Sequence, residues 1–178
     1  MGIIYNFFNG KGLYSINPSK NEIWLESCES ERSLGEFINL INSAEKELKL
    51  VCGELDPKIY EDEKVIKALG NFLKKGGRLK IIFSSPCEEF KNCHPNLFKL
   101  FKKRGLKGLV DLYPAKKRPM QHFTLADTKN LLIEAPNHLP FGKRPSIIIY
   151  NDDKFGLILE KKFEEYIGKL GSGNVCRI

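Results

Sequence analysis

One histidine in this chain has neighbours of the types that phosphate chemistry requires. His122 stands near the start of a predicted strand, and because side chains alternate along a strand, Thr124 is expected on the same face. Glu134 ends the next predicted strand, and Asn137 and His138 follow it, so the five residues can gather at one end of a hairpin. A histidine can act as nucleophile or base, and fixed donors can hold phosphoryl oxygens. A histidine that only forms structural hydrogen bonds is the alternative interpretation.

Positive charge is concentrated around this hairpin. The 178-residue chain has a net charge of +7, yet residues 91–145 hold 12 basic and 3 acidic residues, a balance of +9, and the remainder is at −2. Such a field favours phosphates, nucleic acid or an anionic membrane surface, and a merely solubilising surface is the alternative. The cations that we expect to bind phosphate are Lys116, Lys117, Arg118, Lys129, Lys143 and Arg144.

Apolar periodicity predicts the elements that would position these residues. Apolar residues at helical spacing predict helices near 30–46, before the Gly76-Gly77 pair, from Pro95 to Gly105, and over about 163–170. Strands alternating with such helices indicate an α/β sheet that is parallel where helices intervene. The predicted strands cover 22–26, 48–52, 79–83, 108–113, 121–125, 131–134, 146–150 and 155–159.

The order of these elements and the stretch HFTLADTKNLLIEAPNH resemble one half of a phospholipase D-like domain. The motif of that superfamily has His, one residue, Lys, four residues and Asp, then six residues, Gly, Ser, one residue and Asn. His122 stands at the His position, and Thr124 stands where the motif has Lys. Counted from Asp127, which is two residues early, Glu134 falls at the Gly position and Asn137 at the Asn position.

The resemblance covers residues 31–170 and implies a three-layer αβα sandwich with a mixed sheet. It implies a phosphodiesterase, most plausibly a nuclease, in which His122 forms a phosphohistidine, with Glu134 and Asn137 in a homodimeric site that needs no metal or cofactor. Thr124 supplies no charge to a phosphate. The alternative is therefore a catalytically inactive module of the same fold that binds phosphate or nucleic acid, and a lipid-directed enzyme ranks last because no membrane-binding face is evident.

Glu134 separates the two main alternatives. An ionised carboxylate beside a phosphate would repel it, whereas a carboxylate that orients His122 would leave catalysis possible. The sequence does not say which way Glu134 points.

The rest of the sequence sets the expected organisation and surroundings. We expect an N-terminal arm or edge strand over 1–29, a phospholipase D-like domain over 30–171, and a flexible tail over 172–178. Five scattered cysteines predict a reduced, cytoplasmic protein, and the apolar runs are too short for integral membrane association. Cys87, Cys93 and His94 have no common zinc spacing, so a loop with free thiols is favoured. A helix-borne basic cluster is interpreted as a solvated face: Lys99, Lys102, Lys103, Arg104 and Lys107.

Overall fold

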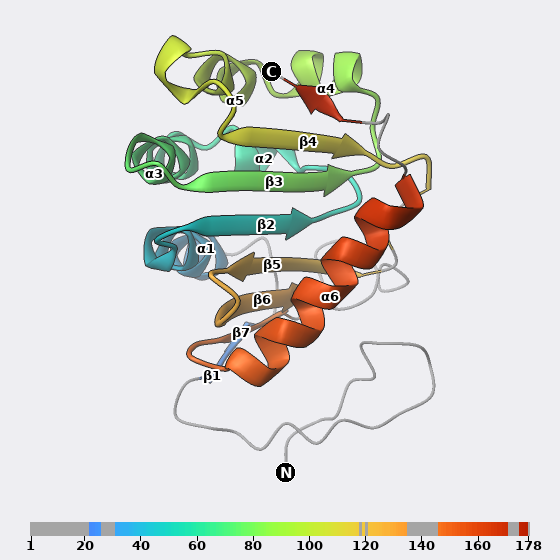
Figure 1. Cartoon of the computed structure of the whole chain (residues 1–178). Helices are drawn as coiled ribbons and strands as arrows, with labels where there is room; N and C mark the ends of the chain where they lie inside the picture. Colours follow the sequence, from blue (N-terminus) through green and yellow to red (C-terminus); the bar gives the residue numbers. More distant parts are fainter. Residues whose placement is uncertain are drawn as a thin grey trace.

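In the computed structural model of this chain, the described residues form a mixed eight-stranded sheet (Figure 1). The structure describes residues 22–25, 31–117, 119, 121–134, 146–170 and 175–177. The strand order is β1-β7-β6-β5-β2-β3-β4-β8. The strands are β1 (Glu22–Leu25), β2 (Glu47–Val51), β3 (Arg78–Phe83), β4 (Val110–Pro114), β5 (His122–Ala126), β6 (Asn130–Glu134), β7 (Ser146–Ile149) and β8 (Cys176–Arg177).

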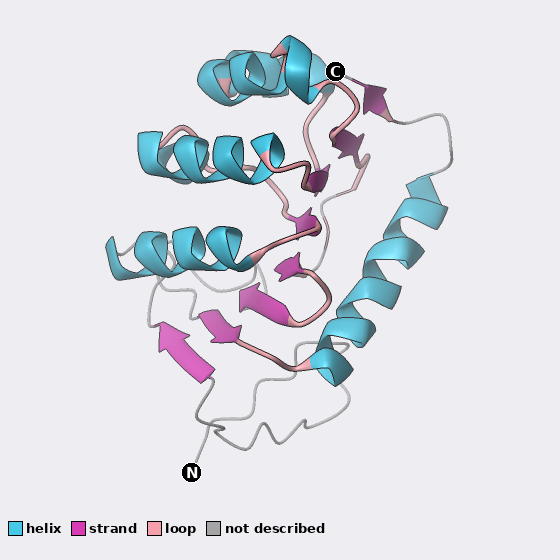
Figure 2. Ribbon diagram, turned by 60° about the vertical axis from the view of Figure 1, so that its left-hand side comes forward, coloured by secondary structure: helices cyan, strands magenta, loops and turns pink. Residues whose placement is uncertain are grey.

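Helices cover both faces of this sheet and form the outer layers. They are α1 (Glu31–Ser43), α2 (Pro57–Tyr60), α3 (Glu63–Lys74), α4 (Cys87–Cys93), α5 (Pro95–Phe101), the 3-10 helix η1 (Arg104–Leu106) and α6 (Asp153–Leu170). Figure 2 shows α1, α3 and α5 on one face, whereas α6 crosses the other face. Two apolar clusters fill the layers between, one under α1, α3 and α5 and the other under α6. The predicted three-layer sandwich is confirmed.

Strand direction explains where the chain can place a site. β2, β3 and β4 are parallel, because a helical segment returns the chain after each of the first two. β5 runs antiparallel to β2, with Val51 opposite Phe123. The start of β5, and therefore His122, lies beside the carboxyl ends of the parallel strands.

The β5–β6 hairpin has the predicted register, with His122 opposite Glu134. Two residues of its turn, Asp127 and Thr128, have φ values of 51° and 61°, as in a type I′ hairpin turn. The Asp127 carboxylate accepts hydrogen bonds from three successive backbone N–H groups, at residues 45, 46 and 47. The turn is thereby fastened to the loop between α1 and β2.

The strand predicted over 155–159 is wrong, because this segment is the first part of the 18-residue helix α6. Asp152 accepts a hydrogen bond from the backbone N–H of Phe155 at 2.9 Å and so caps the helix start. Leu159 and Phe163, four residues apart, are buried against the sheet. Their spacing continues the face of the predicted closing helix, so the helical period extends further back than expected.

A buried cation fastens α6 to the sheet. Lys49 of β2 is 3% exposed, and its Nζ lies 2.8 Å from Glu47 and 2.5 Å from Glu160 of α6. Burial alone would lower the pKa of Lys49, but hydrogen bonds to Glu160 and Glu47 outweigh it and raise the pKa. The cation therefore stays charged and paired in the interior, where an unpaired charge would be costly.

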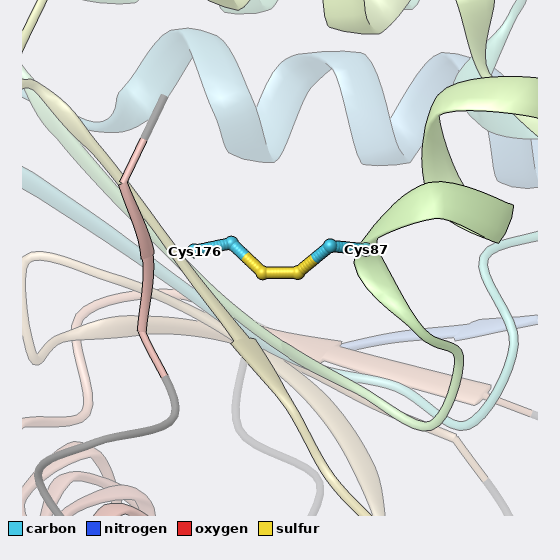
Figure 3. Close-up of a disulfide and its surroundings, with 2 residues drawn as sticks. All are labelled: Cys87 and Cys176. Carbon is cyan, nitrogen blue, oxygen red and sulfur yellow. A yellow bond between two sulfur atoms is a disulfide. The ribbon is translucent and has the colours of Figure 1, made fainter.

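The cysteines differ from expectation. Cys87 begins α4, in a segment predicted as a loop, and forms a disulfide with Cys176 of β8 (Figure 3). β8 pairs antiparallel with β4, so residues 176 and 177 of the expected flexible tail are anchored. The expectation of free thiols fails for this pair because residues 89 positions apart come together only in the folded chain. Cys93 is a free, exposed thiol.

Candidate functional site

His122 lies in the interior at the end of β2, where its ring nitrogens contact two of the described residues. The residue is 6% exposed. Its Nε2 accepts a hydrogen bond from the backbone N–H of Gly53 at 2.9 Å, and its Nδ1 lies 3.2 Å from Oε2 of Glu134. The structure therefore brings together His122 and Glu134, as the hairpin predicts, and adds Gly53 from the loop after β2.

These two contacts define the tautomer of the ring. A backbone N–H can only donate, so Nε2 must be the unprotonated nitrogen. Nδ1 then carries the ring proton and donates a hydrogen bond to the Glu134 carboxylate. This answers the question left open by the sequence, because Glu134 points at His122 and orients its ring.

Two further titratable side chains, Cys52 and Tyr60, are influenced by the charge of Glu134. Burial raises the pKa of the Cys52 thiol, and the charge of Glu134 raises it further. Burial also raises the pKa of Tyr60 well above its usual range, and the charge of Glu134 acts in the same direction. Both groups are therefore held protonated, and Cys52 is not a thiolate nucleophile. Neither was predicted as a site residue, since both stand outside the hairpin.

The position where the superfamily motif has lysine is closed to a ligand. Thr124 is 3% exposed and lies between Leu50 and Leu132 of the neighbouring strands. It shares the face of His122, as alternation predicts, but this face is covered by the helical layer that contains α1. Thr124 is therefore an interior residue.

The predicted cations occupy different places. Lys116 and Lys117 are exposed directly after β4, at the same edge of the sheet as His122 but with β2 and β3 in between. Lys129 belongs to the hairpin turn at the other end of β5, and the strand from His122 to Ala126 alone spans roughly 13 Å, so its assignment to the His122 site is wrong. The remaining predictions lie outside the described residues: Arg118, Asn137, His138, Lys143 and Arg144.

Gly53 is a partner of His122 that the sequence did not predict. It is separated from His122 by 69 positions, and only the antiparallel pairing of β2 with β5 brings the two together. Its signal in the sequence is weak, because a glycine after a strand indicates only that the strand ends. Among the described residues, no three His, Cys, Asp or Glu side chains are grouped so as to hold a metal ion.

The fold is similar to several solved structures of low sequence identity. TrmBL2, an archaeal chromatin protein whose structure shows a novel mode of DNA binding, matches with a TM-score of 0.63 and 15% identity over 84% of this chain and 53% of TrmBL2. The phospholipase D family member Nuc from Salmonella typhimurium matches with a TM-score of 0.57 and 13% identity over 88% of this chain and 95% of Nuc. NucT from Helicobacter pylori matches with a TM-score of 0.56 and 12% identity over 88% and 98%.

The chain therefore has a phospholipase D-like fold, and it spans about half the length of TrmBL2. Residues 29–144, more than half of the chain, match the model of a family described as a domain of unknown function (DUF7931), and the chain belongs to this family. No curated protein matches its sequence. Within the described residues, none of the helices has both the length and the apolar character needed to cross a bilayer.

Proposed function

We propose that this chain is a phospholipase D-fold module that binds the phosphate backbone of nucleic acid without cleaving it. One observation carries the proposal: both ring nitrogens of His122 are engaged, Nε2 by the backbone N–H of Gly53 and Nδ1 by Glu134. A phosphohistidine requires a ring nitrogen whose lone pair faces the phosphorus atom. Here the lone pair of Nε2 faces a backbone donor in the interior.

The charge pattern supports a phosphate-bearing partner. Residues 91–145 carry a balance of +9, and Lys116 and Lys117 are exposed at the same edge of the sheet as His122. A long polyanion gains most from such a surface, because each neutralised phosphate releases condensed counterions. The novel mode of DNA binding of the structurally similar TrmBL2 is compatible with this partner.

A second candidate is a phosphodiesterase that uses His122 as nucleophile in a homodimeric site. The contact between Nδ1 of His122 and Glu134 favours it, since a carboxylate that holds the Nδ1 proton directs the lone pair to Nε2. This activity would require Gly53 to release Nε2 when substrate binds. The site would also lack the lysine of the motif. Loss of one such electrostatic donor is expected to lower the rate by roughly two to three powers of ten.

One experiment separates the two candidates. The full chain is incubated with fluorescein-labelled single-stranded and double-stranded oligonucleotides, and binding is followed by anisotropy while cleavage is followed on gels. We expect binding that weakens steeply as salt rises, without cleavage. The matched variants are Lys116→Gln/Lys117→Gln, which should weaken binding, and His122→Gln, which should leave binding unchanged.

The contrary results are equally distinct. Cleavage that disappears in His122→Gln would establish the phosphodiesterase and overturn the silent module. Binding that does not change between low and high salt, or no binding at all, would contradict a phosphate-backbone partner.

A further inference from the structure

A groove on the outer surface of the helical layer brings together lysines from two separate helices. It runs between α3 and α5, which contact each other and lie side by side in Figure 1, and its volume is about 410 Å³. Lys67 lines it from α3, and Lys99 and Lys103 line it from α5 and the residues that follow. We call it the α3–α5 groove. It lies away from the His122 site, which is in the interior at the end of β2.

The lysines stand on both walls of this groove. Lys67 lines the wall formed by α3, and Lys99 and Lys103, four residues apart, line the opposite wall. All three are exposed. Lys74 is seven residues from Lys67, about two helical turns, so it shares that face of α3 outside the groove lining.

These lysines are uncommitted within the described part of the chain. None of them has an acidic partner at ion-pair distance there, although the same groove contains Glu61 and Glu63. The carboxylate of Glu61 is occupied, since it accepts hydrogen bonds from the backbone N–H groups of Asn96 and Leu97. Internal salt bridges therefore do not explain why lysines face this groove from both walls.

We propose that the α3–α5 groove is a second surface that holds the phosphate backbone of nucleic acid. This inference rests on the proposed function, because it assigns the partner of that function to a specific surface beyond the His122 edge. Ammonium groups on both walls suit a backbone that passes between them, since lysine contacts phosphate as a point charge without demanding one geometry.

An anionic membrane fits this surface less well. Membrane-surface helices insert apolar side chains below their basic residues. The large exposed apolar residues of the described chain are Leu157 and Ile158, and both belong to α6 on the other side of the sheet. The groove thus offers charge without an apolar face to insert.

The test compares two triple variants with the same change in net charge. Lys67→Gln/Lys99→Gln/Lys103→Gln removes the cations of the groove. Lys154→Gln/Lys161→Gln/Lys169→Gln removes three exposed lysines of α6 and is the matched control. The probes are a labelled 20-base-pair DNA duplex, titrated by anisotropy at several salt concentrations, and vesicles of phosphatidylserine and phosphatidylcholine.

We expect the groove variant to bind the duplex at least roughly ten-fold more weakly, with a salt slope smaller by about 2 to 3, as loss of three phosphate contacts predicts. The control should stay within about two-fold of the unmodified chain by the same reasoning. Lys67→Arg/Lys99→Arg/Lys103→Arg should retain binding, because the charge is kept. Thermal melts by circular dichroism check that each variant folds.

The contrary outcomes separate this inference from the proposed function. If the groove variant binds normally while Lys116→Gln/Lys117→Gln does not, the groove is excluded and the proposed function stands. Equal losses in the groove variant and the control would show a general charge effect and overturn the groove. Binding to vesicles but not to DNA overturns both proposals, as does a chain that binds no nucleic acid.

Discussion

The backbone N–H of Gly53 donates a hydrogen bond to Nε2 of His122 at 2.9 Å, and this contact joins the end of β2 to the start of β5. Through Nδ1 the same ring reaches Glu134 of β6. One imidazole thus links three strands at the edge where the parallel strands end. In this arrangement the histidine of the motif position serves to hold the sheet edge together.

This role predicts that His122 matters for stability. His122→Ala leaves the buried N–H of Gly53 without an acceptor and should lower the free energy of unfolding by roughly 2–3 kcal/mol. His122→Gln retains an acceptor for Gly53 and a donor for Glu134, so it should lose less than half of that amount. Urea denaturation of the two variants measures the difference. Equal losses in both would argue that the hydrogen bonds of the ring contribute little.

The Asp127 carboxylate predicts a second effect on stability. It accepts hydrogen bonds from three backbone N–H groups just before and at the start of β2. Asp127→Ala should therefore lower the free energy of unfolding by about 2 kcal/mol or more. Asp127→Asn tolerates the positive φ of this turn position and keeps one oxygen, and it should be intermediate. Chemical denaturation ranks the variants, and an alanine variant as stable as the unmodified chain would show that these bonds are not needed.

A glycine-to-alanine substitution should change the stability in opposite directions at two positions of α6. A Cβ on Gly156 would collide with the carbonyl oxygen of Thr128, so Gly156→Ala should push α6 from the hairpin turn and cost roughly 1–3 kcal/mol. A Cβ on Gly168 meets no atom within 4 Å, and Gly168→Ala should stabilise the helix by about 0.5–1 kcal/mol. Thermal melts compare the pair. Destabilisation by both substitutions would mean that α6 tolerates no added methyl group, irrespective of the turn.

The burial of His94 predicts that the free energy of unfolding depends on pH. The residue is 3% exposed, its Nδ1 has no partner among the described residues, and burial lowers its pKa although Glu61 partly opposes the shift. As the pH falls below about 6.5, the unfolded chain binds a proton at this residue before the folded chain does, so stability falls until the lowered pKa is passed.

The variant His94→Gln removes this titration while its amide can still donate to the carbonyl of Leu55. Its urea midpoint should therefore fall less between pH 7 and pH 5 than that of the unmodified chain, all other titrating groups being shared. Parallel pH profiles for the two proteins would exclude His94 as a source of the dependence.

Local periodicity was enough to predict most of the fold. The apolar face of α1 and the alternation in β5 each lie within one segment of chain, so the sequence alone reveals them. The start of α6 was assigned to a strand because an apolar run of five residues fits either structure, and its helical contacts lie on another element. The capping bond from Phe155 to Asp152 and the packing of Gly156 against the hairpin turn show which structure forms.

The candidate site was less predictable because its contacts depend on how distant strands pair. The proximity of His122 and Glu134 follows from the hairpin, and it was predicted. The bond from Gly53 requires β5 to lie beside β2, and the link between Cys87 and Cys176 requires β8 to lie beside β4. The charge of Lys129 does not reveal that the whole length of β5 separates it from His122, so its predicted place at the site is wrong.

The strand order also determines how this domain would respond to mechanical force. β1 and β8 form opposite edges of the eight-stranded sheet, roughly 34 Å apart at the usual spacing between strands. A pull between them acts across the strands, along their hydrogen bonds, and would unzip the sheet one ladder at a time rather than shear it. At the β8 edge the disulfide transfers the load directly to α4, so with Cys87 and Cys176 joined, the two-residue pairing of β8 with β4 no longer has to bear it alone.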